Sequence, residues 1–164
     1  MAKSIPYHLQ ELRISSCNLT PQITSQLIEV ITKRSYLKQF ELSNAQMSDD
    51  DALGVAQFAM QSKNLEDLDL SFNDLLPKAM DILWSVIREH KKLLFLNIAH
   101  NNLIEGNSGN NEAVVQATEE RVIGHLYRFL RHNKRLIHLD LTSTNLSEAA
   151  IMAILPAIKR AKNL

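Results

Sequence analysis

Apolar residues recur along this chain in a fixed frame, L-x-x-L-x-L-x-x-N-x-L, of which residues 65–75 are the clearest copy. Five copies begin at Leu9, Leu37, Leu65, Leu93 and Leu136. The first four start 28 residues apart, whereas Leu93 and Leu136 are separated by 43 because 15 additional residues intervene. The alternation of apolar and polar residues inside the frame predicts a short β-strand in each copy.

Between the frames, the spacing of apolar residues becomes helical. Positions 13, 10, 9 and 6 before the next frame form one face of an amphipathic helix in every repeat. They are Thr24/Leu27/Ile28/Ile31, Ala52/Val55/Ala56/Ala59, Met80/Leu83/Trp84/Ile87, Ile123/Leu126/Tyr127/Leu130 and Ile151/Ile154/Leu155/Ile158. Thr20, Ser48 and Ser147 stand where helix N-caps are expected.

Each repeat therefore predicts one strand followed by one helix of about three turns. A right-handed crossover would place successive strands side by side in a parallel sheet. One such unit cannot bury its own apolar face, so the units must stack into an α/β solenoid. The sequence predicts a single domain, 1–164, with repeats near 9–36, 37–64, 65–92, 93–135 (which includes an insertion, 104–118) and 136–163.

Over residues 9–164 the pattern resembles that of leucine-rich-repeat proteins. The 28-residue unit with a full helix is similar to the ribonuclease-inhibitor-like subclass, most of whose members are intracellular. The resemblance implies a right-handed horseshoe with strands on the concave side, helices on the convex side, and five repeats plus the start of a sixth at Leu164. We expect an exposed apolar C-terminal edge, which either continues into further repeats or is covered by a partner.

The same resemblance gives a role to the ninth position of the frame. In that subclass it is usually Asn or Cys, whose side chain bonds neighbouring backbone in the turn after the strand. Cys17, Asn73 and Asn101 match this pattern. Ala45 cannot make such a bond and Thr144 can make it only partly, so we expect a weaker ladder at repeats two and five.

Polar side chains between the strand leucines should face away from the helices, on the concave surface. The candidate partner-binding residues are Glu11, Arg13, Gln39, Glu41, Asp67, Asp69, Phe95, Asn97, His138 and Asp140. Five carboxylates face two possible cations, which indicates either a partner with a basic segment or a merely solvated face. Phe95 is a plausible aromatic anchor, whereas Phe72, just beyond the strand, is expected to pack in the turn. Asp67 and Asp69 are interpreted as solvated acids rather than as a catalytic or metal-binding pair.

The insertion at 104–118 is the one irregularity. Gly106 through Asn111 predicts a loop, and Glu112 through Thr118 is expected to lengthen the fourth helix at its N-terminus. Because long loops on regular scaffolds often carry function, it is the second candidate for partner binding, although a tolerated surface insertion is the simpler interpretation.

The composition of the chain argues against several classes of function. Eighteen basic and eighteen acidic residues cancel, so no net charge favours nucleic acid or an anionic membrane. One cysteine, no signal-peptide core and no transmembrane-length stretch favour a cytoplasmic protein. The six scattered histidines do not have metal-ligand spacing, so we expect no metal and no cofactor.

The sequence thus predicts a non-catalytic scaffold for protein–protein interaction, which binds its partner through the strand face and the insertion. Two alternatives remain open. The first is regulation or activation of a small GTPase, which one branch of the resembling subclass performs. The second is a structural segment of a larger cytoskeletal or axonemal assembly.

Overall fold

The computed structural model describes residues 8–33, 36–104, 112–161 and 163–164. Within these ranges, each repeat contributes one strand and then one helix. The strands are β1 (Glu11–Ser15), β2 (Gln39–Ser43), β3 (Asp67–Asp69), β4 (Phe95–Asn97) and β5 (His138–Asp140). The helices are α1 (Pro21–Thr32), α2 (Asp51–Gln61), α3 (Pro77–Ile87), α4 (Glu112–His132) and α5 (Glu148–Ile158).

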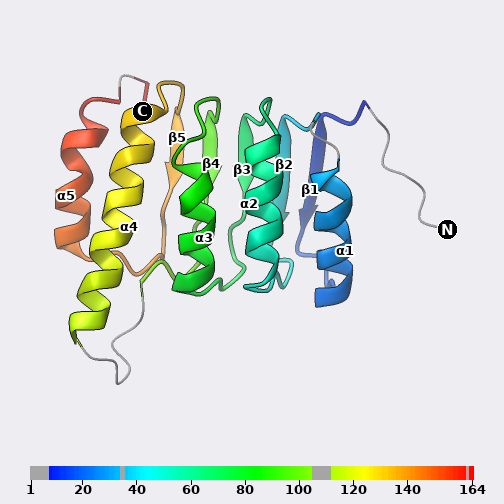
Figure 1. The fold of residues 1–164 in the computed structure, drawn as a ribbon, viewed down its shortest axis with the longest axis horizontal. Coiled ribbons are helices and arrows are strands. Elements are labelled where there is room, and N and C mark those ends of the chain that lie inside the picture. Colours follow the sequence, from blue (N-terminus) through cyan, green and yellow to red (C-terminus); the bar gives the residue numbers. More distant parts are fainter. Residues whose placement is uncertain (1–7, 34–35, 105–111, 162) are drawn as a thin grey trace.

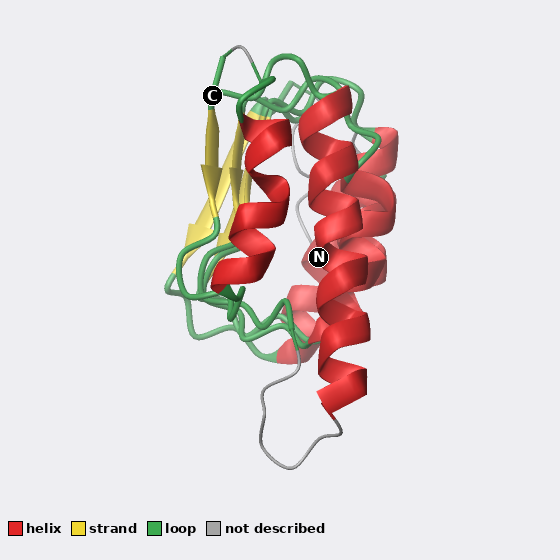
Figure 2. Cartoon of the chain, turned by 90° about the vertical axis from the view of Figure 1, so that its left-hand side faces the viewer, coloured by secondary structure: helices red, strands yellow, loops and turns green. Residues whose placement is uncertain are grey.

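The five strands form one parallel sheet in the order β1-β2-β3-β4-β5, and the helices stand side by side along it (Figure 1). Figure 2 shows that the helices form a second layer on one side of the sheet, while no helix of the described residues lies on the opposite face. The α/β solenoid predicted from the sequence is confirmed. Among the described residues, no helix has the length and hydrophobicity needed to cross a membrane.

The core lies between the two layers. Leu12, Phe40, Leu68, Leu96 and Leu139 occupy one row of the strand register. Leu68 and Leu96 are fully buried, whereas Leu12 and Leu139, in the edge strands, are only partly buried. One prediction for the helix stripe is wrong: Ile151 is 39% exposed. Helix α5 has a neighbouring helix, α4, on one side only. The apolar side chain of Ile151 in its first turns is therefore incompletely covered.

The predicted helix starts are correct at two repeats. Thr20 Oγ1 accepts a hydrogen bond from the Ile23 amide at 3.4 Å, and Ser147 Oγ accepts one from the Ala150 amide at 3.1 Å. Ser48 is different, because α2 begins only at Asp51. There the Asp51 carboxylate accepts hydrogen bonds from the Ser48 amide (3.0 Å) and hydroxyl (2.6 Å). The bond to the amide is half of the capping box that Ser48-Asp-Asp-Asp51 predicts, and the other half, a serine bond to a helix amide, is not formed.

Every strand is followed by the same turn. The eighth frame position has a left-handed backbone in all five repeats, with φ between 47° and 58° at Ser16, Asn44, Phe72, His100 and Ser143. This conformation redirects the chain from the sheet toward the helix layer. Asn, Ser and His tolerate or frequent this region, but a bulky Phe rarely does.

Asn73 and Asn101 form the predicted asparagine ladder behind these turns, with bonds to their own turn and to the turn before it. Asn73 Oδ1 accepts from the Ala45 and Met47 amides (3.1 and 3.3 Å), and its amide nitrogen donates to the Leu42 carbonyl (2.7 Å). Each asparagine therefore reaches back to the preceding turn. Ala45 and Thr144 consequently weaken the junctions between repeats one and two and between repeats four and five.

Candidate functional site

The uncovered face of the sheet carries all ten candidate partner-binding residues. Strand pairing aligns them in two rows across the sheet. The first row is Glu11, Gln39, Asp67, Phe95 and His138, and the second is Arg13, Glu41, Asp69, Asn97 and Asp140. Neighbours in a row belong to strands about 4.8 Å apart, so residues up to 129 positions distant in sequence form one surface.

Several of these side chains are oriented by hydrogen bonds within the face. Arg13 donates to Gln39 Oε1 at 2.9 Å and pairs with Glu11 at 2.8 Å. Asp69 Oδ1 accepts from the Ser71 amide and hydroxyl (2.9 and 2.7 Å), and Asp69 Oδ2 accepts from Asn97 Nδ2 (2.8 Å). The Asp69 carboxylate is therefore fixed.

Asp140, at the far end of the same row, accepts hydrogen bonds from Thr142, which hold the pKa of its carboxyl group below the ordinary value. This carboxylate stays ionised to lower pH than an isolated aspartate. Its negative charge is already compensated by the Thr142 donors.

The carboxylate of Asp67 differs from those of Asp69 and Asp140 in its contacts and in its pKa. Within the described ranges its carboxylate accepts no hydrogen bond and has no basic side chain at ion-pair distance. Partial burial raises its pKa, the charge of Arg13 lowers it, and the nearby carboxylates of Asp69, Glu41 and Glu11 raise it further. Among the described residues, the Asp67 carboxylate at the centre of the face thus has no hydrogen-bond or ion-pair partner, and the charge of Arg13 compensates it only in part.

A shallow hollow of about 170 Å³ lies at this centre. It is lined by Arg13, Gln39, Phe40, Glu41, Asp67 and Asp69. Next to Asp67 in the first row stands Phe95, whose side chain is 40% exposed and whose ring lies 6.3 Å from the His138 ring. An acidic hollow with an exposed aromatic ring beside it is a surface suited to a cation.

Sequence reasoning missed a second aromatic pair. Phe72 does not pack in the turn, because its left-handed backbone turns the ring outward, where it is 51% exposed and stacks on His100 at 4.0 Å between ring centroids. The available signal was the occurrence of two rings at the same frame position of adjacent repeats.

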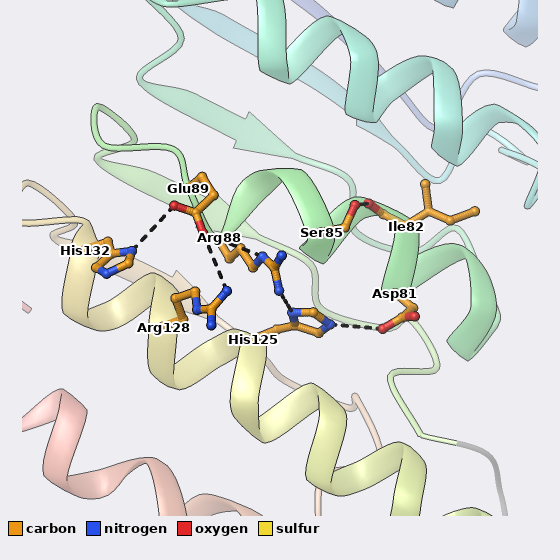
Figure 3. Close-up of polar contacts among 8 residues, drawn as sticks. All are labelled: Asp81, Ile82, Ser85, Arg88, Glu89, His125, Arg128 and His132. Atoms are coloured by element: carbon orange, nitrogen blue, oxygen red, sulfur yellow. Dashed lines mark hydrogen bonds and ion pairs between the residues drawn. The ribbon is translucent and has the colours of Figure 1, made fainter.

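A polar network between α3 and α4 was also not foreseen (Figure 3). Asp81 pairs with Arg121 at 2.9 Å and with His125 Nε2 at 3.0 Å, while Arg88 lies 3.2 Å from His125 Nδ1. Because a guanidinium only donates, Nδ1 accepts and the proton of this neutral imidazole is on Nε2. Burial lowers the His125 pKa; its hydrogen bond to Asp81 opposes this, and the charges of Arg88 and Arg121 add to it.

The insertion is resolved in part. The predicted loop Gly106 through Asn111 lies outside the described residues. Helix α4 begins at Glu112, as predicted, and its first turns extend past the ends of the neighbouring helices (Figure 1). Val114 on this extension is exposed, whereas Thr118 is buried and donates to the Val114 carbonyl at 2.9 Å.

Sequence comparison agrees with this architecture. Residues 8–30 match a family model described as Leucine Rich Repeat, and residues 61–77 match a second model of the same description. These two matches support the leucine-rich repeats predicted from the sequence. The ribonuclease-inhibitor-like subclass remains a prediction. No curated protein matches the chain by sequence.

Solved structures share the fold. One is described as leiomodin-1 actin-binding site 2; it has a TM-score of 0.68 and 18% identity, and the match covers 93% of this chain and 80% of that one. Another is the tropomodulin C-terminal domain of Caenorhabditis elegans, with a TM-score of 0.64, 18% identity, and coverage of 93% and 84%. At this level of identity, the likeness shows the fold alone.

Proposed function

We propose that this leucine-rich-repeat protein is a non-catalytic interaction scaffold that binds a basic segment of a partner protein on its uncovered sheet face. The observation that supports it most is the Asp67 carboxylate, which has no hydrogen bond or ion pair within the described residues and lies at the centre of two rows of polar side chains. A cation from a partner would compensate this charge, and the acidic field would also speed the encounter. A cytoplasmic location belongs to the same proposal.

The shape of the surface favours a protein segment over a small molecule. Five strands about 4.8 Å apart give a face about 20 Å wide. Its hollow holds about 170 Å³, below the roughly 300–1,000 Å³ of a small-molecule pocket. An extended polypeptide can lie across such rows and contact several of them at once.

Reversing the central charges tests the proposal. Glu41, Asp67 and Asp69 are replaced by Lys, and binding of a lysine- and arginine-containing peptide is measured at low salt. The matched control replaces Asp50, Glu112 and Glu120, which are exposed on the helix side, with Lys. We expect binding to be lost only in the sheet-face variant, with helical circular dichroism retained in both. Equal affinity of the two variants would contradict the proposal.

The extension of α4 is the second contact surface in this proposal, because it projects beyond the regular repeats and exposes Val114. Substituting Val114→Asp should weaken binding of a full-length partner without changing binding of the basic peptide. Since Val114 is exposed, the substitution should leave unfolding unchanged. A partner affinity that is insensitive to Val114→Asp would remove this surface from the proposal.

A structural role in a cytoskeletal assembly is the second candidate. It is favoured by the fold shared with a leiomodin-1 actin-binding site and a tropomodulin domain. Co-sedimentation with filamentous actin would test it directly. Sedimentation that persists after the Glu41, Asp67 and Asp69 substitutions would place actin binding away from the sheet face.

A further inference from the structure

We propose that the cation recognised on the sheet face is an arginine side chain, paired with the carboxylates of Asp67 and Asp69 and stacked on the ring of Phe95. This inference rests on the proposed function and specifies its ligand. It distinguishes arginine from lysine, which charge alone does not.

The first argument is the placement of the ring. Asp67 and Phe95 are register partners on adjacent parallel strands and point to the same face. Side chains in such positions start about 5 Å apart, so a group bound at the carboxylate also touches the ring. On the opposite side of Phe95 lies the tilted His138 ring, with 6.3 Å between the two ring centroids, so the Phe95 ring has a neighbour on that side. The exposed part of the ring is therefore accessible beside Asp67.

The second argument is the state of the two carboxylates. Asp69 is held in one orientation by Ser71 and Asn97. Asp67, two residues earlier on the same strand, is free of internal donors within the described residues. One fixed and one unoccupied carboxylate offer several acceptor lone pairs in a small area. A donor with several N–H groups satisfies them better than a single ammonium group does.

The third argument is the chemistry of the cation. A guanidinium is planar and weakly hydrated, and it can stack on an aromatic ring while its edge donates to carboxylates. A lysine ammonium is a compact, strongly hydrated charge and uses only the electrostatic part of such a site. The hollow of about 170 Å³ is lined from β1, β2 and β3, and Asp67 stands between it and Phe95, so the stacked guanidinium would lie at the edge of the hollow.

Arg13 supports this assignment from inside the chain. Its guanidinium already lies on the same face, where it donates to Gln39 and pairs with Glu11. It also borders the hollow and lowers the pKa of Asp67 through its charge. An incoming arginine must therefore share the acidic field with Arg13, and removing Arg13 should strengthen binding.

The test compares two extended peptides that differ only in having arginine or lysine at alternate positions. Their affinities for the full chain are measured by fluorescence anisotropy at low salt. We expect the arginine peptide to bind about two- to fivefold more tightly, because a guanidinium adds planar stacking and further N–H donors to the cation–π attraction that a lysine ammonium also has. Phe95→Leu should abolish that difference, Asp67→Asn should weaken both peptides, and Arg13→Gln should strengthen both.

The outcomes separate the two proposals. Equal affinities of the two peptides, or a preference that survives Phe95→Leu, would overturn the arginine assignment and leave the basic-segment scaffold standing. Failure of both peptides to bind, while Arg13→Gln also binds neither, would overturn the proposed function itself. Circular dichroism of each variant confirms that the fold is unchanged.

Discussion

The inner and outer repeats of this protein are built from the same frame but are held differently. Leu68 and Leu96 in the middle strands are completely buried, while Leu12 and Leu139 at the same frame position in the edge strands are partly exposed. The difference does not come from residue type, since all four are leucines. It comes from the number of neighbouring repeats, which shows that stability here is shared between repeats rather than contained in each.

The hydrogen bonds of the asparagine ladder also differ between the inner and the outer repeats. Asn73 joins repeat three to repeat two, and Asn101 joins repeat four to repeat three through its bonds to the Leu75 amide (3.0 Å) and the Leu70 carbonyl (2.9 Å). In the outer repeat, Thr144 donates only to the Leu141 carbonyl of its own turn, at 2.6 Å. The two inner junctions therefore each have a buried ladder asparagine, and the outer junctions do not.

The largest effect on stability is expected when leucines at the same frame position are truncated in an inner and in an outer repeat. Leu68→Ala should lower the free energy of unfolding by about 2–5 kcal/mol, because it leaves a cavity in a fully buried position. Leu139→Ala, at the same frame position, should cost less than half as much, since its surroundings are already partly open. Urea denaturation measures both. Equal losses would show that the two ends are as tightly packed as the middle.

The ladder gives the next largest effect. Asn73→Ala leaves the Ala45 and Met47 amides without their acceptor in a buried turn, and should cost about 2–4 kcal/mol. Thr144→Ala removes a single bond within one turn and should cost about 1 kcal/mol or less. Chemical denaturation of the two variants side by side provides the measurement. A Thr144→Ala loss as large as that of Asn73→Ala would contradict the assignment of the ladder to inner junctions.

Adding the missing rung should have a smaller effect of opposite sign. Ala45→Asn places an asparagine at the position that Asn73 and Asn101 occupy in later repeats. If its amide reaches the first turn as theirs reach the turns before them, the free energy of unfolding should rise by about 0.5–1.5 kcal/mol. The control is Ala45→Leu, which adds comparable bulk without donors or acceptors and should destabilise the buried site. Thermal melting distinguishes a gain from a loss.

The smallest effect concerns pH at the inner junction between α3 and α4. Burial lowers the His125 pKa in the folded state below its ordinary value of 6.5. The unfolded chain therefore binds the proton more readily than the folded chain. His125 does not lower the free energy of unfolding above about pH 6.5, and it lowers that free energy progressively as the pH falls below this value. Protonation would also remove the acceptor that Arg88 uses and add a cation near Arg121.

Comparing the pH dependence of urea midpoints of the wild type with that of His125→Gln isolates this contribution. His90, whose pKa is also lowered by burial, acts in the same direction in both proteins and serves as an internal constant. A variant with the same decline toward low pH as the wild type would show that His125 does not contribute.

Much of the fold and half of the site followed from periodicity. The alternation within each frame placed the ten polar side chains on one face, because strand side chains point alternately to opposite sides. Three local predictions failed, and only that for Ile151 failed for a tertiary reason. Ile151 lacks a covering neighbour, Phe72 is turned outward by its left-handed backbone, and Asp51 rather than Ser48 supplies the capping side chain.

The sequence by itself determined the strand–helix repeat, its direction and the identity of the polar face, since these depend on spacings within 28 residues. Only the tertiary structure decided which charges on that face are compensated. The electrostatic environment of Asp67 depends on Arg13 from β1 and Glu41 from β2, and Phe95 from β4 is its register partner. Their distances are set by the stacking of repeats. Electrostatic interactions and ring contacts act between side chains that only the assembled sheet brings together.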